Sequence, residues 1–278
     1  IFEKTRGKAL SVTWLGLSTA EFILPVTMVF LLTIISWRHI WISISVLVLI
    51  FLPLISFFLI KKLKIDSRES FTKDEVSKND NIKQWTRSEV LKDYRFYIIS
   101  LNMLSLPSIA TGVFVYQSFI LTSKNWGPFI MAQSFMAYSI LSVITLSISG
   151  FLIDKYTSRK LLMYMNIPLF ISAIILHFFD STYSSFIFLG LIGISNGFAN
   201  VLGSSTWAEI YGVKYIGSIK ALTSGLMVLA TALGTAVFGI LIDNGFSINL
   251  IALYSATYIG IIVILLFFFR KKIQPIYI

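Results

Sequence analysis

The chain has 278 residues, of which 56% are hydrophobic and only 13% are charged, whereas a soluble domain carries roughly 25% charged residues. With a mean hydropathy of +0.82, this composition excludes an ordinary soluble domain and predicts an all-α integral membrane protein in contact with the lipid bilayer. The net charge of +10 comes from bases gathered in the polar loops, so we interpret them as orientation signals and expect no nucleic-acid partner. Cysteine is absent, which excludes disulfides, thiolate metal sites and a cysteine nucleophile.

The sequence begins IFEKTRGKAL, with neither an initiator methionine nor a signal peptide, and we expect a fragment whose amino-terminal part is missing. A helix needs about 20 apolar residues to cross a bilayer. Eight segments meet this requirement, at residues 9–34, 39–60, 96–121, 129–152, 161–179, 184–207, 216–241 and 247–269. Residues 61–95 are polar and lack apolar periodicity, so we expect a loop or a loose surface helix there.

The basic residues are distributed unevenly about these segments. Of the 23 Lys and Arg residues, 21 fall on one side of the predicted membrane, and Arg38 and Lys124 fall on the other. Because loops rich in Lys and Arg stay in the cytoplasm, both ends of the chain and residues 61–95 are predicted to be cytoplasmic. We expect the membrane to be the inner, plasma membrane of a bacterium.

Polar residues recur with a three-segment period after residue 95. The third, fourth, sixth and seventh segments each hold five to eight Ser, Thr, Asn or Gln residues, and the fifth and eighth hold fewer. Because polar groups that face lipid are costly, the polar-rich segments are expected to face a cavity or other helices. A three-helix unit used twice is typical of secondary transporters. The alternative is that the hydroxyls simply bond the backbone of their own helices.

Residues 150–160, GFLIDKYTSRK, place one acid and three bases between two apolar segments, so this hairpin must lie at a membrane face. The stretch resembles the signature Gly-x-Leu-x-Asp-Arg/Lys-x-Gly-Arg-Arg/Lys of the major facilitator superfamily, found between transmembrane helices eight and nine. With one residue of slack, the matching residues are Gly150, Leu152, Asp154, Lys155, Arg159 and Lys160. The signature glycine has no match, because Thr157 and Ser158 occupy that turn.

Three further stretches carry the same resemblance. Arg6-Gly7 and Ser36-Trp37-Arg38 resemble marks around helix five, and WAEIYGVKYIGSIKAL, from Trp207, resembles the loop between helices ten and eleven. The flanking Arg-Gly and Trp-Arg pairs resemble the monocarboxylate and oxalate–formate antiporter branches. The resemblance implies that the eight segments are helices five to twelve of a twelve-helix fold. Its parts would be residues 1–60, the last two helices of the amino-terminal bundle; residues 61–95, a cytoplasmic link; and residues 96–278, the carboxy-terminal six-helix bundle.

Glu21 lies midway along the first segment. An ionisable group at this depth costs about 2.5–3.5 kcal/mol on insertion scales, so we expect Glu21 to face the protein interior. Two roles remain open for it. It is either a carboxylate that couples protons or binds solute, or a hydrogen-bonded helix contact beside Pro25.

Other candidates for a solute cavity lie in the segments that resemble the family's cavity-lining helices seven, eight and ten. Each can bind a solute or bond a neighbouring helix. They are Asn102, Tyr116, Gln117, Gln133, Tyr138, Asn196 and Asn200. Gly193 and Gly197 form a GxxxG pattern, which predicts close packing of that helix against another.

The resemblance also implies a cytoplasmic gate. It would comprise Gly150, Asp154, Lys155, Arg159 and Lys160 of the hairpin together with Glu209, where family members keep an acid that pairs with the signature arginine. The alternative is that these are solvated loop charges that contribute little energy.

The favoured function is therefore a secondary active transporter that moves a small organic solute by alternating access, with the proton as the candidate coupling ion. We expect it to be a monomer that needs no cofactor or metal, since neither His39 nor His177 lies in a ligand cluster. One alternative is an integral-membrane enzyme acting on lipid, for which the sequence lacks clustered acids or histidines at a membrane face. The other is a non-transporting membrane receptor or assembly protein with the same fold.

Overall fold

The computed structural model describes residues 6–62 and 82–277, without the side chains of residues 6–15, 17, 18, 59–62, 154 and 204. This part of the chain forms α-helices and one isolated antiparallel β-bridge, between Ile82 and Tyr277. The helices are α1 (Arg6–Leu32), α2 (Trp37–Lys62), α3 (Arg87–Val90), α4 (Tyr94–Val115), α5 (Gln117–Lys124), α6 (Pro128–Tyr156), α7 (Ser158–Leu161), α8 (Ile167–Phe178), α9 (Thr182–Tyr211), α10 (Ile216–Asp243) and α11 (Ile248–Phe269). The predicted all-helical membrane fold is confirmed.

Six of the described helices are long and apolar enough to cross a membrane, and two shorter apolar stretches cover Thr19–Leu32 and Ile167–Phe178. Each predicted segment corresponds to a helix or to a pair of helices, while the total of eight spans stays a prediction. Two predicted segments are interrupted. Tyr116, at φ −98° and ψ 23°, separates α4 from α5, and residues 162–166 separate α7 from α8.

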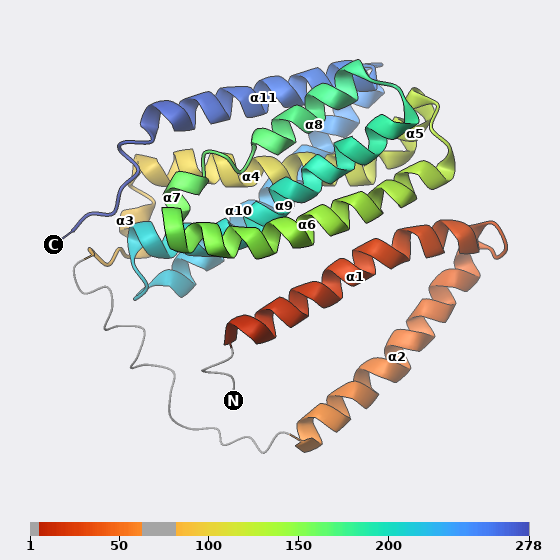
Figure 1. The fold of residues 1–278 in the computed structure, drawn as a ribbon, viewed down its shortest axis with the longest axis horizontal. Helices are drawn as coiled ribbons and strands as arrows, with labels where there is room; N and C mark the ends of the chain where they lie inside the picture. Colours follow the sequence, from red (N-terminus) through yellow and green to blue (C-terminus); the bar gives the residue numbers. More distant parts are fainter. Residues whose placement is uncertain (1–5, 63–81, 278) are drawn as a thin grey trace.

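Helices α4 to α11 pack as one bundle, with α1 running alongside α6 (Figure 1). Helix α2 stands away from this bundle and turns its apolar side chains outward, for example Leu49 at 74% exposure. Helices α8 and α11 pack on each other, and Ile264 and Phe268 of α11 also point outward. Such faces suit lipid or another apolar helix, because neither offers a partner for polar groups.

Among the described helices, α6 and α9 have the most extensive contact, and small residues permit it. A Cβ atom at Gly193 would collide with the backbone carbonyl of Tyr138, and one at Gly197 would lie 2.6 Å from the carbonyl oxygen of Ser142. Only glycine lets the two backbones approach this far. The close packing predicted from Gly193 and Gly197 is confirmed.

The bundle has two distinct ends. One carries the hairpin of residues 150–160, the segment 82–93 and the residues that follow α11; we call it the hairpin end (Figure 1). At the opposite end, Lys124 Nζ lies 2.5 Å from Asp180 Oδ1 and Trp126 donates a hydrogen bond to the Asp180 carbonyl. These contacts tie the turn before α6 to the turn before α9.

Candidate functional site

A cavity of about 400 Å³ lies between α4, α6, α9 and α10, the helices formed by polar-rich segments. Neither α8 nor α11 contributes to its described lining. Polar groups from all four helices face it: Ser100, Tyr138, Asn196, Asn200, Lys220, Thr223 and Ser224. The remaining walls are mainly apolar and include Phe114 and Trp207. A mainly apolar chamber with a few convergent polar groups is the usual form of a site for a small organic molecule.

Three of the predicted cavity residues lie in this lining. Tyr138 packs edge-on against Phe114 and contributes from α6. Asn196 of α9 donates a hydrogen bond of 3.1 Å to Ser142 Oγ of α6, so part of its capacity is used within the bundle. The Asn200 amide has no hydrogen-bonding partner among the described residues and is free to bind a solute.

Glu21 reaches this region from outside the main bundle. It is half-buried on α1, which packs along α6, and its carboxyl group interacts electrostatically with the Tyr138 side chain. Glu21 is not among the described residues that line the cavity, whereas Tyr138 is. This placement leaves open both roles considered for Glu21.

The other four candidates do not line the cavity. Asn102 is fully buried and donates to the Leu162 carbonyl, while its own oxygens accept bonds from Asn166 Nδ2 at 2.6 and 3.0 Å, so it joins α4 to the turn before α8. Tyr116 lies at the break between α4 and α5, and Gln117 and Gln133 are exposed.

Many hydroxyls in the polar-rich helices do bond the backbone of their own helix. Ser105, Ser134 and Ser139 each donate to the carbonyl four residues earlier. Hydrogen bonds to the helix backbone therefore account for part of the polar pattern, the bond to Ser142 accounts for the Asn196 amide, and the cavity accounts for Asn200.

Several lining residues were not singled out from the sequence, chiefly Lys220, Trp207 and Ser100. In the sequence, Lys220 is one of the 21 bases on the predicted cytoplasmic side, and Trp207 begins the stretch that resembles the loop between helices ten and eleven. Helical spacing was the available signal, because Lys220, Thr223 and Ser224 share one face of α10.

At the hairpin end, Glu209 holds the start of α7. Its carboxylate accepts hydrogen bonds from the backbone N–H groups of Ser158 at 2.9 Å and Arg159 at 3.3 Å, and from the Ser158 hydroxyl. Arg159 Nε also lies 3.2 Å from Glu209 Oε1. Because α6, α7 and α9 belong to one bundle, this contact fixes the shape of the hairpin. A gate across two bundles stays a prediction.

The remaining predicted gate residues make fewer contacts. Lys155 and Lys160 are exposed, and Gly150 has open space where a Cβ atom would stand. Asp154 lies in α6, and its side chain is outside the described part of the structure.

Thr157 occupies the turn where the signature resembled by this hairpin has glycine. Its φ of 70° and ψ of 147° lie in a region that β-branched residues rarely adopt. Thr157 therefore adopts a backbone conformation that favours glycine.

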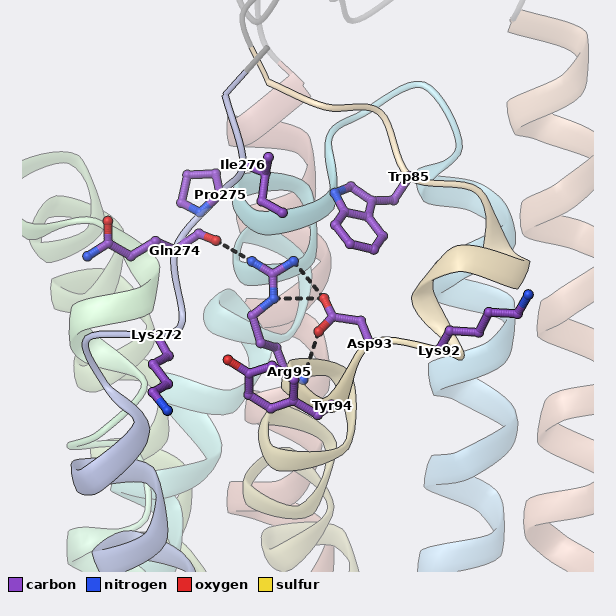
Figure 2. A pocket seen from close by; sticks show the side chains of 9 residues that line it. All are labelled: Trp85, Lys92, Asp93, Tyr94, Arg95, Lys272, Gln274, Pro275 and Ile276. Atoms are coloured by element: carbon purple, nitrogen blue, oxygen red, sulfur yellow. Dashed lines mark hydrogen bonds and ion pairs between the residues drawn. The ribbon is translucent and has the colours of Figure 1, made fainter.

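A second pocket of about 570 Å³ lies at the hairpin end (Figure 2). Figure 2 shows the buried Arg95 guanidinium between Asp93, with Nη2 2.6 Å from Oδ2, and the Gln274 carbonyl oxygen, 2.5 Å from Nη1. Beside it, Lys83 N–H donates to the Ile276 carbonyl and Trp85 N–H to the Tyr211 carbonyl. Because Arg95 is already paired, we interpret this pocket as a junction of three chain segments.

Comparison with known protein families shows which family the chain belongs to. The family model of the Major Facilitator Superfamily matches residues 1–235, and no curated protein matches. The match covers more than half of the chain and includes the helices around the cavity and the hairpin. The chain therefore belongs to the Major Facilitator Superfamily and is a membrane transport protein.

Proposed function

We propose that the chain forms part of a secondary active transporter that moves a small organic solute by alternating access. The observation that carries this proposal is the convergence of polar side chains from α4, α6, α9 and α10 on one cavity inside an apolar bundle. An amide in such a place without a partner among the described residues, as at Asn200, is costly unless a solute or water binds it. Membership of a transporter family supports the same function.

In this proposal the moving parts are residues 1–60 and residues 96–278, joined by residues 61–95. The contact of α1 with α6 would be part of the interface between the two bundles. A solute bound beside Tyr138 and Asn200 would be exposed to alternate sides as the bundles rock. Glu21, on the helix α1 that packs along α6, is the candidate proton-coupling carboxylate.

The setting of this transporter is also a proposal. The predominance of Lys and Arg at the hairpin end supports a cytoplasmic location for that end and for both ends of the chain. We propose that the protein works as a monomer in a bacterial inner membrane.

The test is solute exchange in vesicles reconstituted with the purified protein. A panel of labelled small acids, amines, sugars and amides is screened for counterflow, which detects exchange without a coupling ion. We expect at least one class to exchange, and Asn200→Ala to slow that exchange roughly tenfold through loss of a buried hydrogen bond. Gln133→Ala, at an exposed position of α6, is the matched control. Saturable binding without exchange would instead favour a receptor.

A further inference from the structure

Trp207 forms the part of the cavity wall that α9 contributes nearest to the hairpin end. Of the α9 residues that line the cavity, it lies farthest along the helix, and α9 ends at Tyr211, beside the charged hairpin. Trp207 is only 2% exposed, so nearly all of its surface contacts other residues of the bundle. The position of this wall is therefore decided by the side chains that pack behind Trp207.

Two aromatic rings continue from Trp207 towards the hairpin end. Tyr211 follows Trp207 by one turn of α9 and stacks on it, with ring centroids 6.0 Å apart and an angle of 17° between the planes. Trp85 then meets Tyr211 edge-on, at 5.5 Å and 76°. Both distances lie in the favourable range for pairs of aromatic rings. We call these three rings the aromatic column; it begins at the cavity and ends at the second pocket, which Trp85 lines.

Trp85 belongs to the segment 82–93, and contacts outside the cavity fix its position. Its backbone N–H donates a hydrogen bond of 3.0 Å to the Tyr211 carbonyl. Lys83 Nζ lies 4.2 Å from the centre of the indole ring, and the Arg95 guanidinium, drawn beside it in Figure 2, lies 5.2 Å from the ring. Cations at these distances are attracted to an aromatic face and so help to orient it. No residue of the segment 82–93 occurs in the described cavity lining, so Trp85 acts on the cavity through Tyr211.

We propose that Trp85 is a positioning residue for the cavity: through Tyr211 it holds Trp207 in place and keeps the wall closed towards the hairpin end. This inference rests on the transport function proposed above, because it takes the cavity as the solute site. The segment 82–93 belongs to the predicted link between the two bundles. A displacement of the link would therefore reach the cavity wall along the aromatic column, since chains of packed side chains carry such coupling.

The experiment uses the absence of cysteine from the chain. Gly203→Cys places a single thiol in the cavity lining one turn before Trp207, at a position where a Cβ atom meets open space. With the protein in lipid nanodiscs, the rate at which N-ethylmaleimide labels this thiol reports how often the wall opens, because thiol reactivity depends on exposure. Ala173→Cys, at a buried position of α8, reports global unfolding with the same reagent.

Four variants, each combined with the two reporter thiols in turn, isolate the role of Trp85. Trp85→Ala should speed labelling at position 203 by roughly twofold to tenfold, because it removes one aromatic pair. Trp85→Phe keeps an edge-on ring and should restore most of the original rate. Tyr211→Leu removes the middle ring and should label as fast as Trp85→Ala. Trp126→Ala, the matched control at the opposite end of the bundle, should leave labelling at position 203 unchanged.

The proposal is overturned if Trp85→Ala leaves labelling at position 203 unchanged or if Trp126→Ala speeds it equally. It is also overturned if labelling at position 173 rises in step, because Trp85 would then only stabilise the bundle. Counterflow of the panel of acids, amines, sugars and amides, without the reporter thiols, separates these outcomes from a failure of the transport function. Faster labelling in Trp85→Ala without exchange of any solute would retain the positioning role and reject transport. Exchange of a solute together with unchanged labelling would retain transport and reject the positioning role.

Discussion

The carboxylate of Glu209 accepts a hydrogen bond from the backbone N–H of Ser158, 51 residues earlier in the chain, and so caps the first turn of α7. An acid at the amino-terminal end of a helix satisfies donors that have no partner inside the helix. The same carboxylate pairs with Arg159. The charged hairpin therefore owes its shape to the end of α9 as well as to its own sequence.

Removing this carboxylate should loosen the hairpin. We expect Glu209→Ala to speed hydrogen exchange of the Ser158 and Arg159 amides by roughly tenfold, since a hydrogen bond to a charged group contributes about 1.5–3 kcal/mol. Glu209→Gln keeps one acceptor oxygen and should give an intermediate rate. Hydrogen exchange with mass spectrometry measures both, and unchanged exchange in Glu209→Ala would contradict the capping role.

Thr157→Gly should stabilise the protein. A β-branched residue at φ 70° costs about 1–3 kcal/mol, and its buried hydroxyl has no partner in the described structure, so glycine should raise the free energy of unfolding by about 1 kcal/mol. Thermal unfolding in detergent measures the change. Thr157→Ala removes the hydroxyl but keeps the unfavourable backbone. If alanine stabilises as much as glycine, the strain is not the cause.

Gly193→Ala should separate α6 from α9. The added methyl group would meet the Tyr138 backbone, and the forced shift should cost roughly 1–3 kcal/mol and lower solute exchange, because Tyr138 lines the cavity. Gly203→Ala on the same helix meets open space and controls for the effect of alanine itself on stability. Equal unfolding temperatures for the two variants would refute the close packing.

Asn102→Ala should affect stability more than solute affinity. It leaves the Leu162 carbonyl without its side-chain partner and removes one of the two hydrogen bonds that the Asn166 amide donates to Asn102, at a cost of roughly 1–3 kcal/mol. Asn200→Ala should do the opposite, because its amide has no described partner to lose. The unfolding temperature and the solute Kd are measured for both variants. A large change in Kd for Asn102→Ala alone would contradict this prediction and show that Asn102 binds the solute.

Glu21→Gln should separate coupling from exchange. Glutamine keeps the size and hydrogen bonding of Glu21 and fixes a neutral form, so accumulation driven by an imposed pH gradient should be lost while downhill exchange continues. Uptake and counterflow in the same vesicles measure the two activities. Accumulation that survives the substitution would make Glu21 a structural contact between α1 and α6.

The helical membrane fold could be predicted from the sequence because its determinants are local. Each apolar segment must satisfy its backbone within its own helix, so the apolar runs alone locate the helices. The glycines at 193 and 197 also predicted a close helix contact, since their effect depends on spacing along one helix. The position of the charged hairpin between two such segments followed from the same requirement.

The partner of each polar side chain was decided only by tertiary structure. Asn102 and Asn200 have the same chemistry and both lie in polar-rich segments, yet one is bonded to Asn166 and the other faces the cavity. Lys220 is one of many bases in the sequence, and its place in the lining depends on how α10 is rotated against α4. Rotation and contact between helices are set by packing of residues far apart in the chain, so the sequence pattern of a single helix does not contain them.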